Sequence, residues 1–368
     1  MYSEEFYRVA LQFVEGYGNA TLKKMLRLSG NATEFFEHPE IWREQMNSRK
    51  NKFSIPKITE AMRRLVDTEL KLMARDHIQL CLCVDGNYPY RLKRCNDSPL
   101  AFFYKGTDCF NDLRMLALVG TREASEYGRN CVRKLLSDLR DCDITTVSGL
   151  AYGVDTIAHS HSLEMNMRTV AVLGNGFHTV YPQSNARLAL QIIEHGGALI
   201  SEYTYYTNPD RLNFPKRNRI IAGMSDAIIV IETANKGGSM ITANIAQSYN
   251  RDVFAVPGTI FDTNHDGCHE LIRNNVAAIL YSGQHLVEMM NWRRQTPRAV
   301  QTALFVELNE AERRVVETIR AVESMSVDAI ADAFPDRSPS KLAGLLLSLE
   351  LRGVLTCKPG KVYSLNAF

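Results

Sequence analysis

Glycines and hydroxyl side chains gather in short loops that follow apolar runs of strand length. Those of interest are Gly120, Ser125, Ser148, Gly149, Gly174, Gly176, Gly238, Ser239 and Thr242. Glycine lets the backbone approach a phosphate closely, and a Ser or Thr hydroxyl adds a hydrogen-bond donor. Arg122 can bind one phosphate through two hydrogen bonds, and Lys236 can act as a point charge. Any single glycine could simply make a tight turn, but five such loops together favour a phosphate-binding site.

A cluster of cations interrupts the ordinary connecting segments. The sequence DRLNFPKRNR carries Arg211, Lys216, Arg217 and Arg219, next to Phe214. Because the whole chain has a net charge of only +2, binding of nucleic acid must depend on such a local patch. Cations combined with aromatic rings on which bases stack are typical of proteins that bind single strands. A solvated charged face would carry interspersed acidic residues instead, so the pattern favours single-stranded nucleic acid.

Several other chemistries lack the residues that they require. A dinucleotide site needs G-x-G-x-x-G after the first strand, whereas only Gly174-Asn175-Gly176 occurs, after the third, with Thr179 at the last glycine position. Neither a G-x-x-x-x-G-K-[ST] loop nor a G-x-S-x-G elbow is present. Asp155 and His159 could ligate a metal, but the sequence offers no convincing third ligand. The alternative is that they form hydrogen bonds at the start of a helix. We expect neither a metal nor a cofactor.

The composition is that of an ordinary globular chain, with 45% hydrophobic and 23% charged residues. The eight cysteines include no CxxC pair, so a zinc ribbon is not indicated. No apolar run reaches the roughly 18 residues of a membrane-spanning helix, and the start of the chain is acidic where a signal peptide is basic. These features predict a cytoplasmic protein that does not insert into a membrane.

Alternating apolar runs and amphipathic segments define the middle of the chain. The runs of strand length are 116–120, 144–149, 169–174, 198–202, 227–232, 252–258 and 277–281. Because the runs are continuously apolar, they predict an α/β fold, a Rossmann-like, doubly wound and mostly parallel sheet with both faces covered. We place this domain at 77–292, with its core at 116–281.

The two ends of the chain predict smaller domains. Residues 1–76 have helical spacing, with Gly16-Tyr17-Gly18 in a helix-hairpin-helix or SAM-like pattern that could either pack or contact DNA. A polar linker at 293–299 leads to residues 300–368. There, helical patterns at 310–322, 327–334 and 338–352 precede a short hairpin, which is the winged-helix order. The last of these helices is mostly apolar, which favours weak duplex contact or partner docking over sequence-specific reading.

Ordered motifs give the chain a resemblance to one family. GTREASEYG, SGLAYGVDTIAH, TVAVLGNGFHTVYP, LISEY, FPKRNRIIAG, KGGSMITA and FAVPG follow one another between Asp85 and Ile272. In these motifs the chain resembles the DNA-processing protein A family (DprA, also called Smf). One departure is Asn275, where the family usually has glycine; asparagine also tolerates a positive φ.

The resemblance implies function as well as fold. It implies a homodimer that binds single-stranded DNA, protects incoming DNA and loads RecA recombinase onto it during natural transformation, without catalysis. By motif, Arg122 and Lys236 would bind phosphates, and the loop residues above would shape the pocket. Arg217, Asn218 and Arg219 would form its basic wall, next to Phe214.

An enzyme is the alternative. Gly237-Gly238 before Thr242 is similar to the phosphoribohydrolase loop G-G-x-G-T-x-x-E, which would make the protein a nucleotide hydrolase. In this chain Met240 stands at the third glycine and Asn244 at the glutamate. Since general acid–base chemistry needs that carboxylate, we expect no enzyme activity.

Overall fold

The computed structural model describes residues 2–46, 53–292, 309–322, 324–335, 337–352, 354–358 and 361–365. They belong to two compact units, Met1–Arg294 and Gln295–Phe368. The predicted linker at 293–299 lies outside the described residues. Within the described ranges, no helix combines the length and apolar character needed to cross a membrane.

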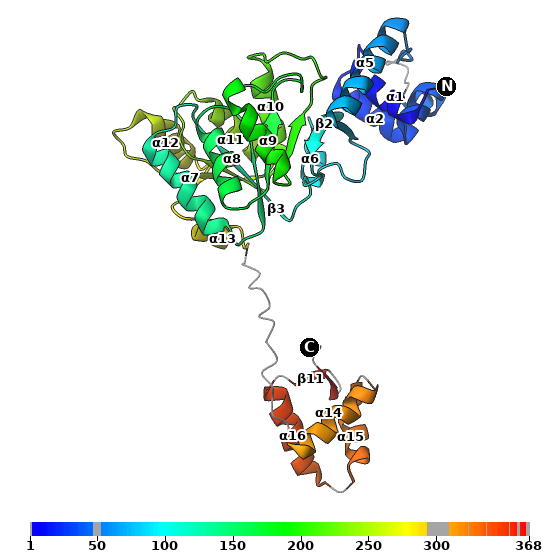
Figure 1. Cartoon of the computed structure of the whole chain (residues 1–368), viewed down its shortest axis with the longest axis vertical. Helices are drawn as coiled ribbons and strands as arrows, with labels where there is room; N and C mark the ends of the chain where they lie inside the picture. Colours follow the sequence, from blue (N-terminus) through cyan, green and yellow to red (C-terminus); the bar gives the residue numbers. More distant parts are fainter. Residues whose placement is uncertain are drawn as a thin grey trace. The chain divides into compact units, whose positions relative to one another are not determined.

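A large sheet forms the centre of the first unit (Figure 1). Counted over the described residues it has nine strands, in the order β1-β2-β6-β5-β4-β3-β7-β8-β9. The strands are β1 (Gln79–Leu82), β2 (Ala101–Gly106), β3 (Arg114–Val119), β4 (Ile144–Ser148), β5 (Thr169–Leu173), β6 (Ala198–Ser201), β7 (Ala227–Val230), β8 (Asp252–Ala255) and β9 (Ala278–Ile279). From β6 to β9 all neighbours pair in parallel, which confirms the predicted doubly wound sheet.

An antiparallel ribbon extends this sheet. β1 pairs with β2, and β2 pairs with β6, both antiparallel. Both strands of this ribbon lie within residues 79–106, before the parallel part of the sheet begins at β3.

Both faces of the sheet are buried, because both sets of alternating side chains are apolar. On β3, Met115, Ala117 and Val119 belong to one core cluster, and Leu116 and Leu118 belong to another. The first face is covered by α6 (Tyr90–Lys93), α10 (Asn213–Met224), α11 (Gly238–Ser248) and α12 (Asp266–Arg273), with η3 (Thr263–His265) leading into α12. The opposite face is covered by α7 (Glu126–Leu139), α8 (Val154–Glu164), α9 (Ala186–Glu194) and α13 (Gly283–Met289), with η2 (Gln183–Asn185) leading into α9.

The winding direction of the sheet reverses between β3 and β7. From β3 the chain proceeds through β4, β5 and β6 to one side, and then through β7, β8 and β9 to the other. The loops that leave β3 and β7 therefore diverge and leave a crevice at the carboxyl ends of the strands. Open parallel sheets bind ligands at such a position.

The N-terminal helices share their core with the sheet. They are α1 (Glu4–Ala10), η1 (Leu11–Phe13), α2 (Asn19–Ser29), α3 (Ala32–Glu37), α4 (Glu40–Met46) and α5 (Glu60–Asp76). Tyr7, Leu26 and Trp42 are fully buried and belong to the same apolar cluster as Phe102 of β2. The predicted Gly16-Tyr17-Gly18 turn joins η1 to α2, with Gly16 at a φ of +83°. Figure 1 shows these helices next to β2 and α6.

The second unit is smaller and has its own core. Its elements are α14 (Glu310–Val322), β10 (Ser324–Ser326), α15 (Val327–Ala333), α16 (Pro339–Leu351), β11 (Leu355–Lys358) and β12 (Val362–Leu365). The described strands form an antiparallel sheet in the order β10-β12-β11. Val315, Ile330 and Leu346 are buried together beneath it. The helices match the predicted ranges to within one residue, while the winged-helix assignment stays a prediction.

Candidate nucleic-acid interface

A cavity of about 700 Å³ opens at the reversal point of the sheet. Its walls come from the loop after β3, the loop after β7 and the start of α10. The predicted site residues that line it are Gly120, Arg122, Phe214, Arg217, Asn218, Gly238, Ser239 and Thr242. Segments far apart in the sequence thus meet at one place.

Arg122 and Phe214 combine a cation with an aromatic ring at this cavity. Arg122 is exposed, and its Cζ atom lies 5.6 Å from the centroid of the Phe214 ring. The ring of Tyr181 also lines the cavity, with its centroid 5.5 Å from that of Phe214. The guanidinium can bind a phosphate while the rings stack with bases.

The start of α11 offers a second position for an anion. Gly237 precedes the helix and has no side chain with which to cap it. The Ser239 hydroxyl is buried at the cavity and has no hydrogen-bond partner within the described part of the chain. The N–H groups in the first turn of a helix have no partner within the helix, and they favour negative charge. Thr242 lines the cavity one turn further on, and Lys236 is exposed just before the helix.

Arg217 lies at the cavity but is almost completely buried, with 4% of its surface exposed. Its Nη1 atom donates to the carbonyl oxygen of Gly149 at 2.6 Å and also to that of Val172. Burial lowers the pKa of Arg217 to about 10, although the nearby Asp155 carboxylate opposes this shift. Arg217 therefore stays charged at neutral pH, but its hydrogen bonds fix the ends of β4 and β5.

Gly149 and Gly174 make room for side chains of α10. A Cβ atom on Gly149 would lie 2.4 Å from the Arg217 guanidinium, and one on Gly174 would lie 2.7 Å from the Phe214 ring. We expected both glycines to let the backbone approach a phosphate. In the structure, neither lines the cavity, and both let α10 pack closely against the sheet.

Asp155 and His159 are engaged with neighbouring protein groups. Asp155 accepts hydrogen bonds from the backbone N–H groups of Gly149 and Ala151, at 3.1 and 3.2 Å. Burial raises its pKa, with Arg217 opposing. The Nδ1 atom of His159 lies 2.7 Å from the Thr169 hydroxyl, and burial together with Arg217 lowers the pKa of His159 to about 3. Of the two interpretations of this pair, the geometry matches hydrogen bonding at the helix start.

Three further predicted residues, like Gly174, support the loops and do not line the cavity. Ser125 caps α7 by accepting from the backbone N–H of the third residue along. The Ser148 hydroxyl donates to a carbonyl oxygen of β3 at 2.7 Å. Gly174 packs against Phe214, and the N–H of Gly176 donates to the loop before α10 at 2.8 Å.

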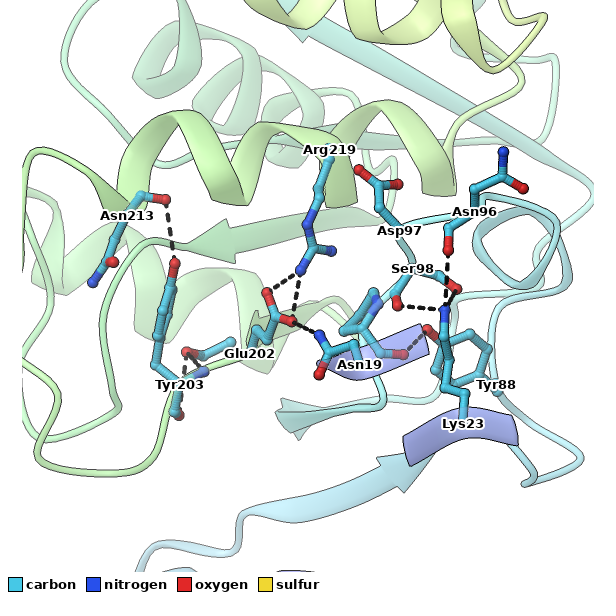
Figure 2. A network of polar contacts seen from close by, with 12 residues as sticks. Asn19, Lys23, Tyr88, Asn96, Asp97, Ser98, Glu202, Tyr203, Asn213 and Arg219 are labelled. Carbon is cyan, nitrogen blue, oxygen red and sulfur yellow. Dashed lines mark hydrogen bonds and ion pairs between the residues drawn. The ribbon is translucent and has the colours of Figure 1, made fainter. Parts of the chain in front are cut away.

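Arg219 lies outside the cavity, in contrast to the expected basic wall. Its Nη2 atom donates to both carboxylate oxygens of Glu202, at 2.6 and 2.5 Å, and Glu202 also accepts from Asn19 (Figure 2). Residues two apart on a helix do not face the same side. Arg217 and Arg219 therefore point in different directions, and each makes hydrogen bonds to other groups of the protein.

Sequence reasoning missed several lining residues. They include Thr121, Glu123, Tyr181 and Thr233. Arg211, a member of the predicted cation cluster, is exposed and lines the cavity as well. It takes the place that was expected for Arg219 in the basic wall.

Comparison with known proteins supports one family. The family model described as DNA recombination-mediator protein A matches residues 79–291, which include the whole cavity. This chain belongs to that family. Protein Smf of Escherichia coli (strain K12) is 33% identical over 301 residues, which cover 81% of this chain and 80% of that protein.

Two solved structures agree with this assignment. The structure of DNA processing protein A from Streptococcus pneumoniae has a TM-score of 0.62 and 31% identity, covering 77% of this chain and 97% of that one. A structure of DNA processing protein A from Helicobacter pylori, described for its single-stranded DNA binding mode, has a TM-score of 0.52 and 27% identity. It covers 59% of this chain and 97% of that one. The recombination-mediator family and its mixed α/β fold are thus established for the chain.

Proposed function

We propose that this protein binds single-stranded DNA in the cavity between the loops after β3 and β7. The observation that carries the proposal is the pairing of exposed Arg122 with the Phe214 ring, in a cavity that also holds the open start of α11. The Helicobacter pylori relative, whose structure concerns single-stranded DNA binding, supports it.

The aromatic side chains favour a single strand over a duplex. A base can stack on Phe214 or Tyr181 only if it has left its neighbours, and in a duplex this unstacking costs a few kcal/mol. In a single strand the bases are already accessible for stacking, and the phosphates can reach Arg122 and Ser239.

The test is binding of a fluorescently labelled oligothymidine, followed by anisotropy over a range of salt concentrations. Log affinity should fall linearly with log salt, because bound cations displace counterions from the strand. Arg122→Ala should weaken binding by about 10-fold to 100-fold, as expected for a hydrogen bond to a charged group, and reduce the salt slope by roughly 1.

Arg140→Ala is the matched control. Arg140 is an exposed arginine beside Asp141 at the far end of α7, and it does not line the cavity. If Arg122→Ala and Arg140→Ala bind single strands equally well, the cavity is not the binding site.

We further propose that the protein performs no covalent chemistry on its ligand. Asn244 is exposed on α11 and does not line the cavity, and the Asp155 carboxylate is held by two backbone N–H groups. Incubation with nucleoside monophosphates should release no free base; release of base that Glu123→Gln abolishes would establish the hydrolase instead.

Membership of the recombination-mediator family supports a role upstream of a recombinase. We propose that the bound strand is protected and handed to RecA in the cytoplasm during natural transformation. RecA filaments should form faster on strands coated with single-strand-binding protein when this protein is added. Equal rates with and without it would contradict this part of the proposal.

We also propose a homodimer. β9 is an edge strand among the described strands, and Ile279 and Tyr281 at this edge are 46% and 68% exposed. Met289 of α13, the next helix along the chain, is also exposed, at 54%. Light scattering should give twice the chain mass, and Tyr281→Arg should give monomers; a wild-type monomer would contradict the dimer.

A further inference from the structure

The segment between β6 and α10, residues 202–212, connects the N-terminal helices with the cavity. We call it the β6–α10 loop. Its last part carries Arg211, and the first two turns of α10 carry Phe214 and Asn218, all of which line the cavity. Its first part contacts α2 and α5, which do not line the cavity.

Tyr205 is the main attachment of this loop to α5. Its backbone N–H donates to the buried Glu69 carboxylate at 2.7 Å. Its hydroxyl donates to Asp76 at 2.6 Å and accepts from Arg75 at 2.6 Å. The backbone oxygen of Tyr205 accepts from the N–H of His178 at 3.1 Å. One buried residue thus joins α5, the loop after β5 and the β6–α10 loop.

Glu202 attaches the same loop to α2 and to α10. Its carboxylate accepts from Asn19 of α2 at 3.2 Å and from Arg219 of α10 at 2.5 and 2.6 Å (Figure 2). The hydroxyl of Tyr203 lies 3.4 Å from the carbonyl oxygen of Asn213, where α10 begins. The side chains of Glu202 and Arg219 are only 16% and 15% exposed. Solvent therefore screens this ion pair less than it screens a surface pair.

The residues that make these contacts do not line the cavity. Glu69 is buried, and Arg219 is neutralised by Glu202, so neither can bind a phosphate. What they fix is the path of the chain that ends at Arg211 and Phe214. A distant mutation that displaces a functional group by about 1 Å can strongly reduce the function of that group.

We propose that the N-terminal helices act on DNA binding as a positioning element, through Glu69, Asn19 and the β6–α10 loop. The inference rests on the proposed function of the cavity. It adds that α2 and α5 determine how well Arg211 and Phe214 are placed, and that they do so without touching the DNA.

The main test is Glu69→Ala in the full chain. It removes the acceptor of the Tyr205 N–H, so oligothymidine affinity should fall by about 3-fold to 10-fold, the equivalent of one hydrogen bond. The slope of log affinity against log salt should fall by at most roughly 1, because Arg211 is the only cation in residues 202–212. Glu69→Gln keeps an acceptor oxygen at the same position and should restore wild-type affinity.

Glu60→Ala is the matched control. Glu60 lies on the same helix and is exposed, with Arg63 and Arg64 as its partners. This variant should bind as wild type. Should Glu69→Ala fail to fold, Tyr205→Phe takes its place, because it removes only the hydroxyl that Asp76 and Arg75 contact; it should weaken binding in the same way.

Two further readouts separate positioning from a general loss of structure. Hydrogen exchange in Glu69→Ala should increase in residues 202–214 and stay unchanged in β3 and β4. In an Arg211→Ala, Phe214→Ala background, Glu69→Ala should have little further effect on affinity, because effects of coupled residues are not additive.

Three results would overturn the inference. They are wild-type affinity for both Glu69→Ala and Tyr205→Phe, a salt slope in Glu69→Ala that falls by clearly more than the single charge of Arg211, and full additivity with the Arg211 and Phe214 substitutions. A larger fall in the slope would mean that cations outside the β6–α10 loop are lost from the binding site. If Arg122→Ala also binds as wild type, the proposed function of the cavity fails; if Arg122→Ala is weakened while Glu69→Ala is not, only the positioning role fails.

Discussion

Arg122 and Arg217 line the same cavity but differ in nearly every physical respect. Arg122 is exposed against an aromatic ring, whereas Arg217 is buried and bonded to the ends of β4 and β5. Both carry the same guanidinium group. The difference shows that the surroundings of a charge decide whether it is available to a ligand or holds the protein together.

Because Arg217 is buried, its charge supports the folded structure. Its charge is close to Asp155, and burial disfavours the charged forms of both. Taking one partner away leaves the other buried and unpaired, which is the costly case for buried charges. Removing a partner of Arg122 has no such cost, because Arg122 is exposed and water takes the place of the lost partner.

The largest expected effect is therefore on stability, in Arg217→Leu. The free energy of unfolding in urea should fall by about 3–5 kcal/mol, because two carbonyl oxygens and Asp155 lose their partner. Arg122→Ala should change it by less than about 0.5 kcal/mol. The exposed neighbour Lys216→Ala is the control for the α10 surface, and an Arg217→Leu protein as stable as that control would remove the distinction between the two arginines.

The next effect concerns the ring beside Arg122. Phe214→Ala should weaken oligothymidine binding by about 1–3 kcal/mol, the range measured for one stacked base. The salt slope should stay unchanged, in contrast to Arg122→Ala, because no cation is lost. Phe261→Ala is a control, since Phe261 is 91% exposed and does not line the cavity. Equal losses in the two phenylalanine variants would exclude a specific stacking position.

A smaller effect is predicted for pH. Burial, together with Arg217, lowers the pKa of His159 to about 3, from an ordinary value of 6.5. The unfolded chain therefore binds a proton that the folded chain rejects between these values, and stability is lost as pH falls from 6.5 toward 3. Urea unfolding at pH 7 and pH 5 should show the wild type losing roughly 1–2 kcal/mol more than His159→Gln. Parallel losses would show that His159 is not kept neutral.

The smallest effect is expected at Lys236. This exposed lysine precedes α11, and a solvated ammonium group gives a modest contact. Lys236→Ala should weaken oligothymidine binding by about 2-fold to 5-fold, as for an exposed charge interaction of up to 1 kcal/mol. A loss as large as that of Arg122→Ala would show that the two exposed cations act alike.

The sequence predicted the sheet well because its strands are continuously apolar, and burial on both faces requires that pattern. It also predicted the turn at Asn275, which has a φ of +55°. The separate roles of Arg217 and Arg219 could not be predicted, since neighbouring cations in one motif look alike in sequence. Their roles depend on the rotation of α10 and on Glu202 and Asn19, which are distant in the chain.

The reversal of the sheet between β3 and β7 also has a consequence for folding. Residues 120–123 and 233–242 lie more than a hundred positions apart, and the cavity exists only when both halves of the sheet have assembled. A partly folded chain can present Arg122 without the start of α11, so it has no complete site. A strand that binds only the finished fold stabilises it by mass action, by about 2.7 kcal/mol at a free concentration of 100 times Kd. Under the proposed function, single-stranded DNA would thus select fully folded molecules from a population that is still folding.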